Sequence, residues 1–372
     1  MRSRRAFGVV IAVALLVAGL PAYAALPPGW SQATASLSQP RDALAATSVG
    51  DYAIFGGGTN SISGPSNVVD IFNSGTAQWS TASLSQARGY LAATSLGDCA
   101  FFAGGWADSG YVSTVDILNV TTGQWSIASL SLARMHLSAA CVNNYALFAG
   151  GWNGSSRVDI YNAGTGQWTT ATLTEGRSSP AAVTVGDCAI FAGGNGGNNG
   201  HSDVVDIFNA STGTWSTARL SVGRQGLAGV SVGHYAVFAG GRANHTGVSD
   251  VVDIFDAATG QWSTATLSKK RTELAATVLG DYAIFAGGGG GMSGVDTVDI
   301  FNSVTGQWST ATLSQGRNCL AATSLGDYAL FGGGNGDGAS SATVDVFILP
   351  EPATLSLLAL GGLMALRRRA RH

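Results

Sequence analysis

The chain has 372 residues, of which 53 are glycine, and a formal net charge of −3. Three arginines lie within the first five residues and four within the last six. Without these two ends, the chain has twelve basic and twenty-one acidic residues, which gives a net charge of −9. Because binding to nucleic acid phosphates needs clustered lysine and arginine, so acidic a body excludes nucleic acid as the expected partner.

The N-terminal segment has the three parts of a secretory signal. A basic stretch over residues 1–5 precedes an apolar stretch over residues 6–20, and Ala22, Tyr23 and Ala24 form a small-residue cleavage site. We therefore expect residues 1–24 to direct export and to lie outside the folded body.

One pattern then recurs seven times: an arginine, a short apolar run ending in Gly-Gly, a Val-Asp-Ile or Val-Asp-Val triplet and, in six of the copies, a tryptophan. The repeated arginines are Arg41, Arg88, Arg134, Arg177, Arg224, Arg271 and Arg317. The repeated aspartates are Asp70, Asp116, Asp159, Asp206, Asp253, Asp299 and Asp345. A period in the range of 43 to 47 residues is typical of a repeat architecture, so the long chain is expected to form one domain.

The unit that begins at Arg271 shows what each repeat should form. Its apolar runs over residues 274–279, 282–286, 298–301 and 308–313 are separated by turn residues and are too short for helices. Four short strands joined by tight turns form an antiparallel sheet that cannot bury both faces alone. Radial packing of seven such sheets, as in a β-propeller, solves that problem.

The two ends of the repeat region predict how the ring closes. The seventh unit stops at residues 348–350 without a tryptophan, and Trp30 has no Val-Asp-Ile triplet before it. We therefore expect residues 30–37 to supply the missing fourth strand of the last sheet, which removes an exposed edge. Trp30 lies eleven residues before its arginine, whereas the six tryptophans of the repeated pattern lie nine before theirs, which predicts a two-residue bulge or a longer turn.

The spacing within each unit resembles that of kelch repeats. In that family a Gly-Gly pair follows an apolar strand, and an aromatic residue and a tryptophan follow with six residues between them, as in Phe72/Trp79, Tyr161/Trp168, Phe208/Trp215, Phe255/Trp262 and Phe301/Trp308. The resemblance implies an all-β, seven-bladed kelch-type β-propeller over residues 30–349, with its last blade closed by the N-terminal strand. Such a fold does not by itself decide function.

The repeated arginines and aspartates are expected to be structural. One identical charge per blade suits an ion pair, either across one sheet or to a neighbouring blade, because a buried arginine is usually paired. The four cysteines are interpreted as small buried apolar residues, with one disulfide involving Cys141 left open.

Binding residues are expected where the blades differ. In kelch proteins the loops after the repeated arginine and the loops after Gly-Gly commonly form the binding face, so the resemblance implies a site there. The candidates for ligand binding are Tyr90, Trp106, His136, Trp152, His201, Arg242, His245 and Glu273. Trp106 and Trp152 occupy equivalent places in neighbouring blades and are suited to stack on sugar rings or to anchor a protein.

Two function classes remain open at this point. The first is a non-catalytic interaction module, without cofactor or metal, that binds a protein or a polysaccharide. The alternative is a carbohydrate-active or copper-dependent enzyme similar to galactose oxidase, which would need His136, His201 and His245 to converge with Glu273 and Tyr90. The sequence contains no nucleophile elbow, phosphate loop or sequential metal-ligand spacing, which favours the binding module.

The C-terminal segment resembles a PEP-CTERM sorting signal. Pro350, Glu351 and Pro352 precede fourteen mostly apolar residues, 353–366, and a cluster of arginines. The resemblance implies transient anchoring in the inner membrane, cleavage by an exosortase-type enzyme, and release to the cell surface or extracellular matrix of a Gram-negative bacterium. A plain C-terminal anchor is the alternative, although fourteen residues are fewer than the roughly 20 that a spanning helix needs. We expect the exported body to be a monomer.

Overall fold

The protein is all-β, in a computed structural model that describes residues 26–350 except 153, 197–199, 245 and 291–292. The predicted signal at residues 1–24 and the tail from Glu351 onward lie outside the described residues. Within the described part of the chain, no helix has the length and apolar character needed to cross a membrane. The all-β propeller class predicted from the repeats is confirmed.

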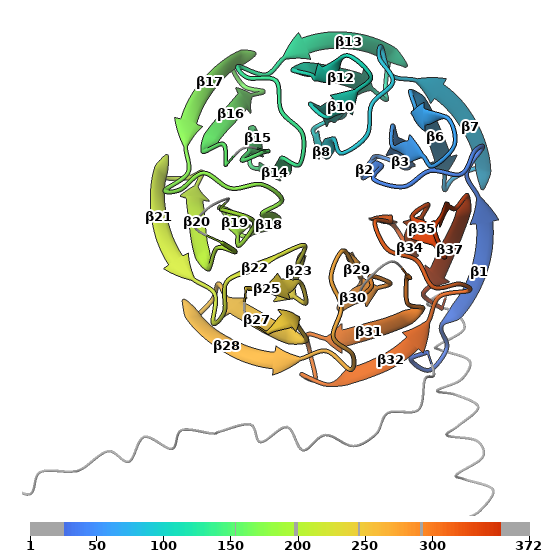
Figure 1. Cartoon of the computed structure of the whole chain (residues 1–372), viewed down its shortest axis with the longest axis vertical. Helices are drawn as coiled ribbons and strands as arrows, with labels where there is room; N and C mark the ends of the chain where they lie inside the picture. The colour runs from blue at the N-terminus through green and yellow to red at the C-terminus, as the bar shows by residue number, and fades with distance from the viewer. Residues whose placement is uncertain (1–25, 153, 197–199, 245, 291–292, 351–372) are drawn as a thin grey trace, which may run out of the picture.

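The described residues form seven four-stranded antiparallel sheets, one for each repeat, arranged as a ring around a central axis (Figure 1). The innermost strands are β2 (Ala45–Val49), β8 (Ala92–Leu96), β14 (Ser138–Val142), β18 (Ala181–Val185), β23 (Ala228–Val232), β29 (Ala275–Leu279) and β33 (Ala321–Leu325). The second strands are β3 (Tyr52–Gly56), β9 (Cys99–Ala103), β15 (Tyr145–Ala149), β19 (Cys188–Ala192), β24 (Tyr235–Ala239), β30 (Tyr282–Ala286) and β34 (Tyr328–Gly332). The third strands are β6 (Val68–Asn73), β12 (Thr114–Asn119), β16 (Arg157–Asn162), β20 (Val204–Asn209), β27 (Val251–Asp256), β31 (Thr297–Asn302) and β37 (Thr343–Ile348). The outer strands are β7 (Gln78–Ser83), β13 (Gln124–Ser129), β17 (Gln167–Thr172), β21 (Thr214–Arg219), β28 (Gln261–Thr266), β32 (Trp308–Thr312) and β1 (Ser31–Ser36).

The N-terminal strand closes the last sheet, as predicted. β1 pairs antiparallel with β37, from Ser31 opposite Ile348 to Ser36 opposite Thr343. The sheet that ends the chain therefore takes its outer strand from the beginning of the chain, and β37 is not left as an exposed edge.

The bulge predicted in this closing strand is wrong. The pairing of β1 with β37 is continuous, and it places Gln32 opposite Phe347, where another blade places Trp79 opposite Phe72. Trp30 precedes the strand and packs edge-on against Tyr282 of the neighbouring sheet, with ring centroids 4.9 Å apart. A glutamine thus occupies the repeated tryptophan position, and the tryptophan is half-buried against the adjacent blade instead.

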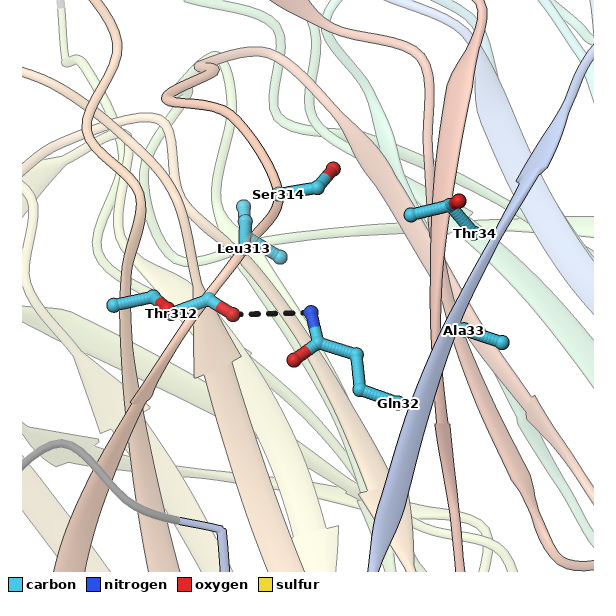
Figure 2. Close-up of a pocket in the computed structure, with 6 residues that line it drawn as sticks. All are labelled: Gln32, Ala33, Thr34, Thr312, Leu313 and Ser314. Carbon is cyan, nitrogen blue, oxygen red and sulfur yellow. Dashed lines mark hydrogen bonds between the residues drawn. The ribbon is translucent and has the colours of Figure 1, made fainter.

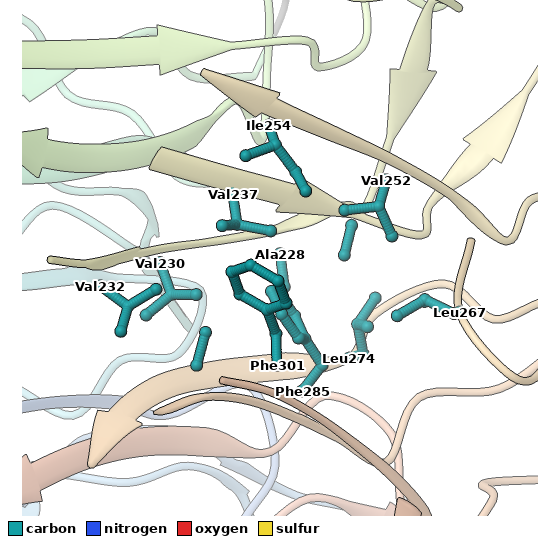
Figure 3. Packing of buried hydrophobic residues seen from close by; sticks show 12 residues of the cluster. Ala228, Val230, Val232, Val237, Val252, Ile254, Leu267, Leu274, Phe285 and Phe301 are labelled. Carbon is teal, nitrogen blue, oxygen red and sulfur yellow. The ribbon is translucent and has the colours of Figure 1, made fainter. Parts of the chain in front are cut away.

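The core consists of apolar layers between neighbouring sheets. In the layer shown in Figure 3, Val230 and Val237 of the fifth sheet meet Phe285 and Phe301 of the sixth. The second strands carry the most buried runs, whereas the outer strands are largely exposed. Each sheet thereby buries both of its faces against its two neighbours, which one sheet cannot do alone.

The Gly-Gly pairs allow the blades to approach closely. Gly57 has φ of 65°, and a Cβ atom on it would lie 2.6 Å from the carbonyl oxygen of Arg88 in the next blade. The N–H of Gly58 donates to that same carbonyl at 2.9 Å. The pair is therefore required by the junction between blades, and not only by the turn at the end of β3.

The Arg and Gly-Gly ends of all seven sheets lie on one side of the ring, which we call the axial face. Short two-residue strands pair with one another in the loops that follow Gly-Gly, and one strand at a repeated arginine pairs with such a loop. These strands are β4 (Thr59–Asn60), β5 (Gly64–Pro65), β10 (Trp106–Ala107), β11 (Gly110–Tyr111), β22 (Arg224–Gln225), β25 (Arg242–Ala243), β26 (Gly247–Val248), β35 (Asn335–Gly336) and β36 (Ala339–Ser340).

Candidate functional site

A buried ion pair holds each blade at the axial face. The seven repeated arginines are at most 1% exposed, and each pairs with the repeated aspartate of its own unit. In five of the pairs the closest nitrogen and oxygen are 2.6–2.7 Å apart. Burial lowers the pKa of Arg88, and the Asp116 carboxylate opposes that change. These charges are satisfied inside the fold and are not available to a ligand.

The same aspartates also bind the chain segment that arrives from the preceding blade. Asp116 accepts a hydrogen bond from the backbone N–H of Ser85, which follows β7, at 2.9 Å. Asp70 accepts one from Ser38, which follows the closing strand β1, at 2.9 Å. Each carboxylate therefore joins two neighbouring sheets, and the axial face is a rigid base for its loops.

Seven residues form a ring around the axis, two positions after each repeated arginine. This axial ring consists of Ala43, Tyr90, His136, Ser179, Gly226, Glu273 and Cys319, all with φ between 48° and 63°. At six junctions the N–H of one member donates to the carbonyl of another in the adjacent blade, at 2.7–3.1 Å. The left-handed backbone favours glycine, yet only Gly226 is one, and each other member bears strain of about 1 kcal/mol.

Aromatic side chains gather on one arc of the axial ring. The rings of Tyr90 and His136 lie 4.6 Å apart between centroids, and Trp152 lies 6.0 Å from His136 on its other side. Trp152 is 43% exposed. Three of the predicted residues, Tyr90 of the second blade and His136 and Trp152 of the third, thus form a continuous row across one junction between blades.

Acidic and neutral polar groups continue this arc. The Cys319 thiol donates to a Glu273 carboxylate oxygen at 3.2 Å, and Asp42 directly precedes Ala43 in the ring. Burial raises the pKa of Tyr90, with further raising by Asp42, Cys319 and Glu273. Burial also raises the pKa of the Cys319 thiol well above its usual value, and the Glu273 carboxylate adds to that effect. The raised pKa favours the protonated thiol, which serves as a hydrogen-bond donor to Glu273.

The remaining predicted residues lie elsewhere on the axial face. The backbone N–H of His201 donates to the side-chain oxygen of Asn244 at 2.8 Å, so the loops of the fourth and fifth blades meet. Burial lowers the pKa of His201, and a hydrogen bond involving the Arg242 backbone opposes that change. Arg242 is exposed on β25, and Trp106 is half-buried in the β10–β11 hairpin. His245 lies outside the described residues.

The structure refines which residues after the arginines belong together. Asp42, Gln225 and Asn318 directly follow their arginines, so each lies one position before the axial ring and pairs with a Gly-Gly loop. Cys319 was interpreted as buried apolar filling, whereas it belongs to the ring. Counting two residues from every arginine would have found it.

Two further features bear on the chemistry of the chain. All four cysteines are free and half-buried, so the open disulfide at Cys141 does not form. In the described part of the chain, no three His, Cys, Asp or Glu side chains come together as metal ligands. The predicted trio that includes His245 is not fully within that part.

A shallow pocket lies at the outer rim and not on the axial face. It has a volume of about 360 Å³ and lies at the seam between β32 and β1 (Figure 2). Its lining residues are Gln32, Ala33, Thr34, Thr312, Leu313 and Ser314. The Gln32 side-chain amide donates to the Thr312 carbonyl across it at 3.1 Å. None of the predicted binding residues lines this pocket.

Comparison with known proteins agrees with the architecture. The Kelch motif family model matches residues 87–129, which begin just before Arg88 and end with the outer strand of the second blade. No curated protein matches the chain. The motif and the all-β ring together support a kelch-repeat β-propeller, and kelch repeats suggest a protein-interaction module.

Proposed function

We propose that this protein is an exported, non-catalytic interaction module of the cell envelope or extracellular matrix. It binds a protein or polysaccharide partner through the axial face, around the axial ring. The proposed address is the surface or matrix of a Gram-negative bacterium, reached through the N-terminal signal and an exosortase-type enzyme that acts at Pro350, Glu351 and Pro352. The exported body is proposed to act as a monomer.

The observation that carries this proposal is the contrast between backbone and side chains in the axial ring. The backbone repeats from blade to blade, with the same left-handed φ at all seven positions and the same hydrogen bond at six of the junctions. The side chains do not repeat, and six of the seven positions retain one where glycine would be less strained. Strained residues on a rigid scaffold are typical of functional sites, and loops on such a scaffold commonly bind ligands.

The position of the chain ends supports the proposed sorting. The N–H of Leu349 donates to the carbonyl of Asp327, in the turn opposite the axial face, and Gly29 packs beside Pro350. Both ends of the described chain therefore leave from the side away from the axial ring. A tail anchored there would leave the axial face free to meet a partner.

A binding experiment tests the proposal. The full-length protein is immobilised and exposed to separated envelope proteins and exopolysaccharide from the source cells, and saturable binding is measured. We expect Trp152→Ala to reduce binding at least about fivefold, because exposed aromatics at a binding face often contribute 1 kcal/mol or more. Val304→Ala removes an exposed apolar residue from the opposite face and is the matched control.

Two results would count against the proposal. Saturable binding that is equally strong in the Trp152 variant would place the site elsewhere. A complete lack of binding to both fractions would contradict the interaction module itself.

A further inference from the structure

Two carboxylates at the axial ring lack a cationic partner among the described residues. Asp42 accepts hydrogen bonds from the hydroxyls of Thr59 and Ser340, at 2.5 and 2.8 Å. Glu273 accepts one from the Cys319 thiol and is exposed. The seven repeated aspartates, by contrast, are all neutralised by buried arginines. The negative charge at the axis is therefore free to act on a ligand.

The backbone brings these groups onto one arc. The Cys319 N–H donates to Glu273, the Ala43 N–H to Cys319, and the Tyr90 N–H to Ala43, at 2.9–3.1 Å. His136 follows Tyr90 in the same way at 3.0 Å. A carboxylate, a thiol, a second carboxylate beside Ala43 and two aromatic rings are thus consecutive, and we call them the acidic-aromatic arc. The opposite side of the ring has only Ser179 and Gly226.

The charges on this arc favour a cation. Burial lowers the pKa of His136, which keeps its ring neutral near pH 7, and burial raises the pKa of Tyr90. The aromatic part of the arc therefore carries no positive charge that would repel a cation. Aromatic faces attract ammonium and guanidinium groups, and the attraction adds to that of nearby carboxylates.

The hydrogen-bonding groups favour a ligand that only donates. Both oxygens of Asp42 already accept hydroxyl hydrogens, and the Cys319 thiol donates to Glu273. The two carboxylates of the arc therefore offer only acceptors to a ligand. Sugar hydroxyls both donate and accept, whereas lysine and arginine side chains only donate and have an apolar stem that can lie along aromatic rings.

We propose that the acidic-aromatic arc receives a lysine or arginine side chain from an exported partner protein. The cationic group lies between Asp42 and Glu273, the stem lies along Tyr90 and His136, and Trp152 contacts the neighbouring part of the partner. This inference rests on the proposed function, and it names the partner class that the axial face binds.

A peptide selection tests this inference. A random peptide library is selected on the full-length protein at low ionic strength, and enriched peptides are synthesised together with twins in which norleucine or citrulline replaces lysine or arginine. We expect enriched peptides to contain a basic residue, and their neutral twins to bind at least about fivefold more weakly. Glucosamine oligomers and neutral glucose oligomers are measured in parallel.

Charge-removing variants locate the contact. Glu273→Gln and Asp42→Asn preserve the shape of the side chains. Each should lower the affinity for the basic peptides about fivefold, and this effect should disappear as salt screens the charges. The matched control is Asp108→Asn, which removes an exposed carboxylate from another loop of the axial face and should change affinity less than twofold. Thermal unfolding of each variant verifies that the fold is retained.

The outcomes separate the inference from the proposed function. Suppose that the peptides bind the Glu273→Gln and Asp42→Asn variants as strongly as the wild type but no longer bind Trp152→Ala. That result would overturn the cationic inference, and the proposed interaction module would stand. Glucosamine oligomers that bind through Glu273 when no peptide does would overturn the protein partner in favour of an amino polysaccharide. Absence of binding to all peptides, oligosaccharides and envelope fractions would overturn both.

Discussion

A single buried charge pair per repeat does two tasks in this fold. The arginine donates to carbonyls inside its own blade, as Arg134 does to Phe148 at 2.9 Å, while the paired aspartate accepts from the linker of the preceding blade. Removal of one partner would leave the other buried and unpaired. Such losses cost more than the net contribution of the pair, because the desolvation of the remaining charge is no longer offset.

Asp116→Ala should therefore destabilise the protein by about 3–5 kcal/mol, as expected when one member of a buried pair is removed. The measurement is urea unfolding followed by tryptophan fluorescence. Arg219→Gln is the control, because it breaks the exposed pair with Asp203, in which the arginine side chain is 69% exposed. That variant should lose less than about 1 kcal/mol, and similar losses in both variants would contradict the structural role of the buried pair.

His136 links the axial ring to pH. Because burial lowers its pKa in the folded state, the unfolded chain binds the proton more readily between the ordinary value of 6.5 and the lower native value. Stability should consequently fall as pH decreases from 6.5 through that interval, and His136→Gln should flatten this part of the pH profile. Unfolding curves measured at several pH values test this.

The Glu273 carboxylate shifts the pKa of the same histidine in the direction opposite to burial. Glu273 raises the pKa of His136 while burial lowers it more strongly, so Glu273→Gln should move the pKa of His136 still lower. An NMR titration of the imidazole proton measures both values. A wild-type pKa at or above 6.5, or an upward shift in the variant, would contradict the arrangement of the arc.

At the scale of elements, we expect the closing strand β1 to stabilise the whole ring. β1 contributes six paired residues to β37, and Leu37, just after it, is 4% exposed in the layer with Leu44 and Phe55. Deletion of residues 31–37 removes this strand and opens an apolar layer. The melting temperature should fall by at least about 5 °C, since losing one buried leucine alone costs about 2–5 kcal/mol.

Replacement of residues 61–63 by two glycines is the control for this deletion. It shortens an exposed turn that includes Ile62, which is 95% exposed, and should change the melting temperature by a degree or two. If the strand deletion melts as late as this control, then β1 does not stabilise the ring.

The strands were predictable because the residues that end each strand are adjacent to it in the sequence. Glycine pairs and turn residues fix the ends of each strand, so the unit beginning at Arg271 forms strands within one residue of those expected. The packing of Trp30 was not predictable, because it depends on Tyr282, which lies about 250 residues further along the chain in another blade. The axial ring depends on closure in the same way, since its hydrogen bonds exist only between blades that are already packed.

At the scale of the whole molecule, the two sides of the ring differ in what they carry. The axial face carries the uneven side chains, and the opposite side carries both ends of the described chain, where Leu349 lies beside Gly280. With the tail anchored in a membrane, the propeller would present the axial ring outward. Cleavage of the tail would then release the body without altering the axial face.

Tail processing is the prediction that belongs to this scale. We expect mass spectrometry of the cell-associated protein to find no peptide that extends beyond residues 350–352, because the proposed exosortase-type enzyme would separate the body from the apolar segment. Alanine at Pro350, Glu351 and Pro352 should keep the chain intact through Arg368 and hold it in the membrane fraction. Alanine at Ser303, Val304 and Thr305, in an exposed turn on the same side of the ring, should leave processing unchanged. Detection of peptides through Arg368 in the wild-type surface protein would mean that the segment is retained as an anchor, and the axial ring would then bind its partner from a fixed position at the membrane.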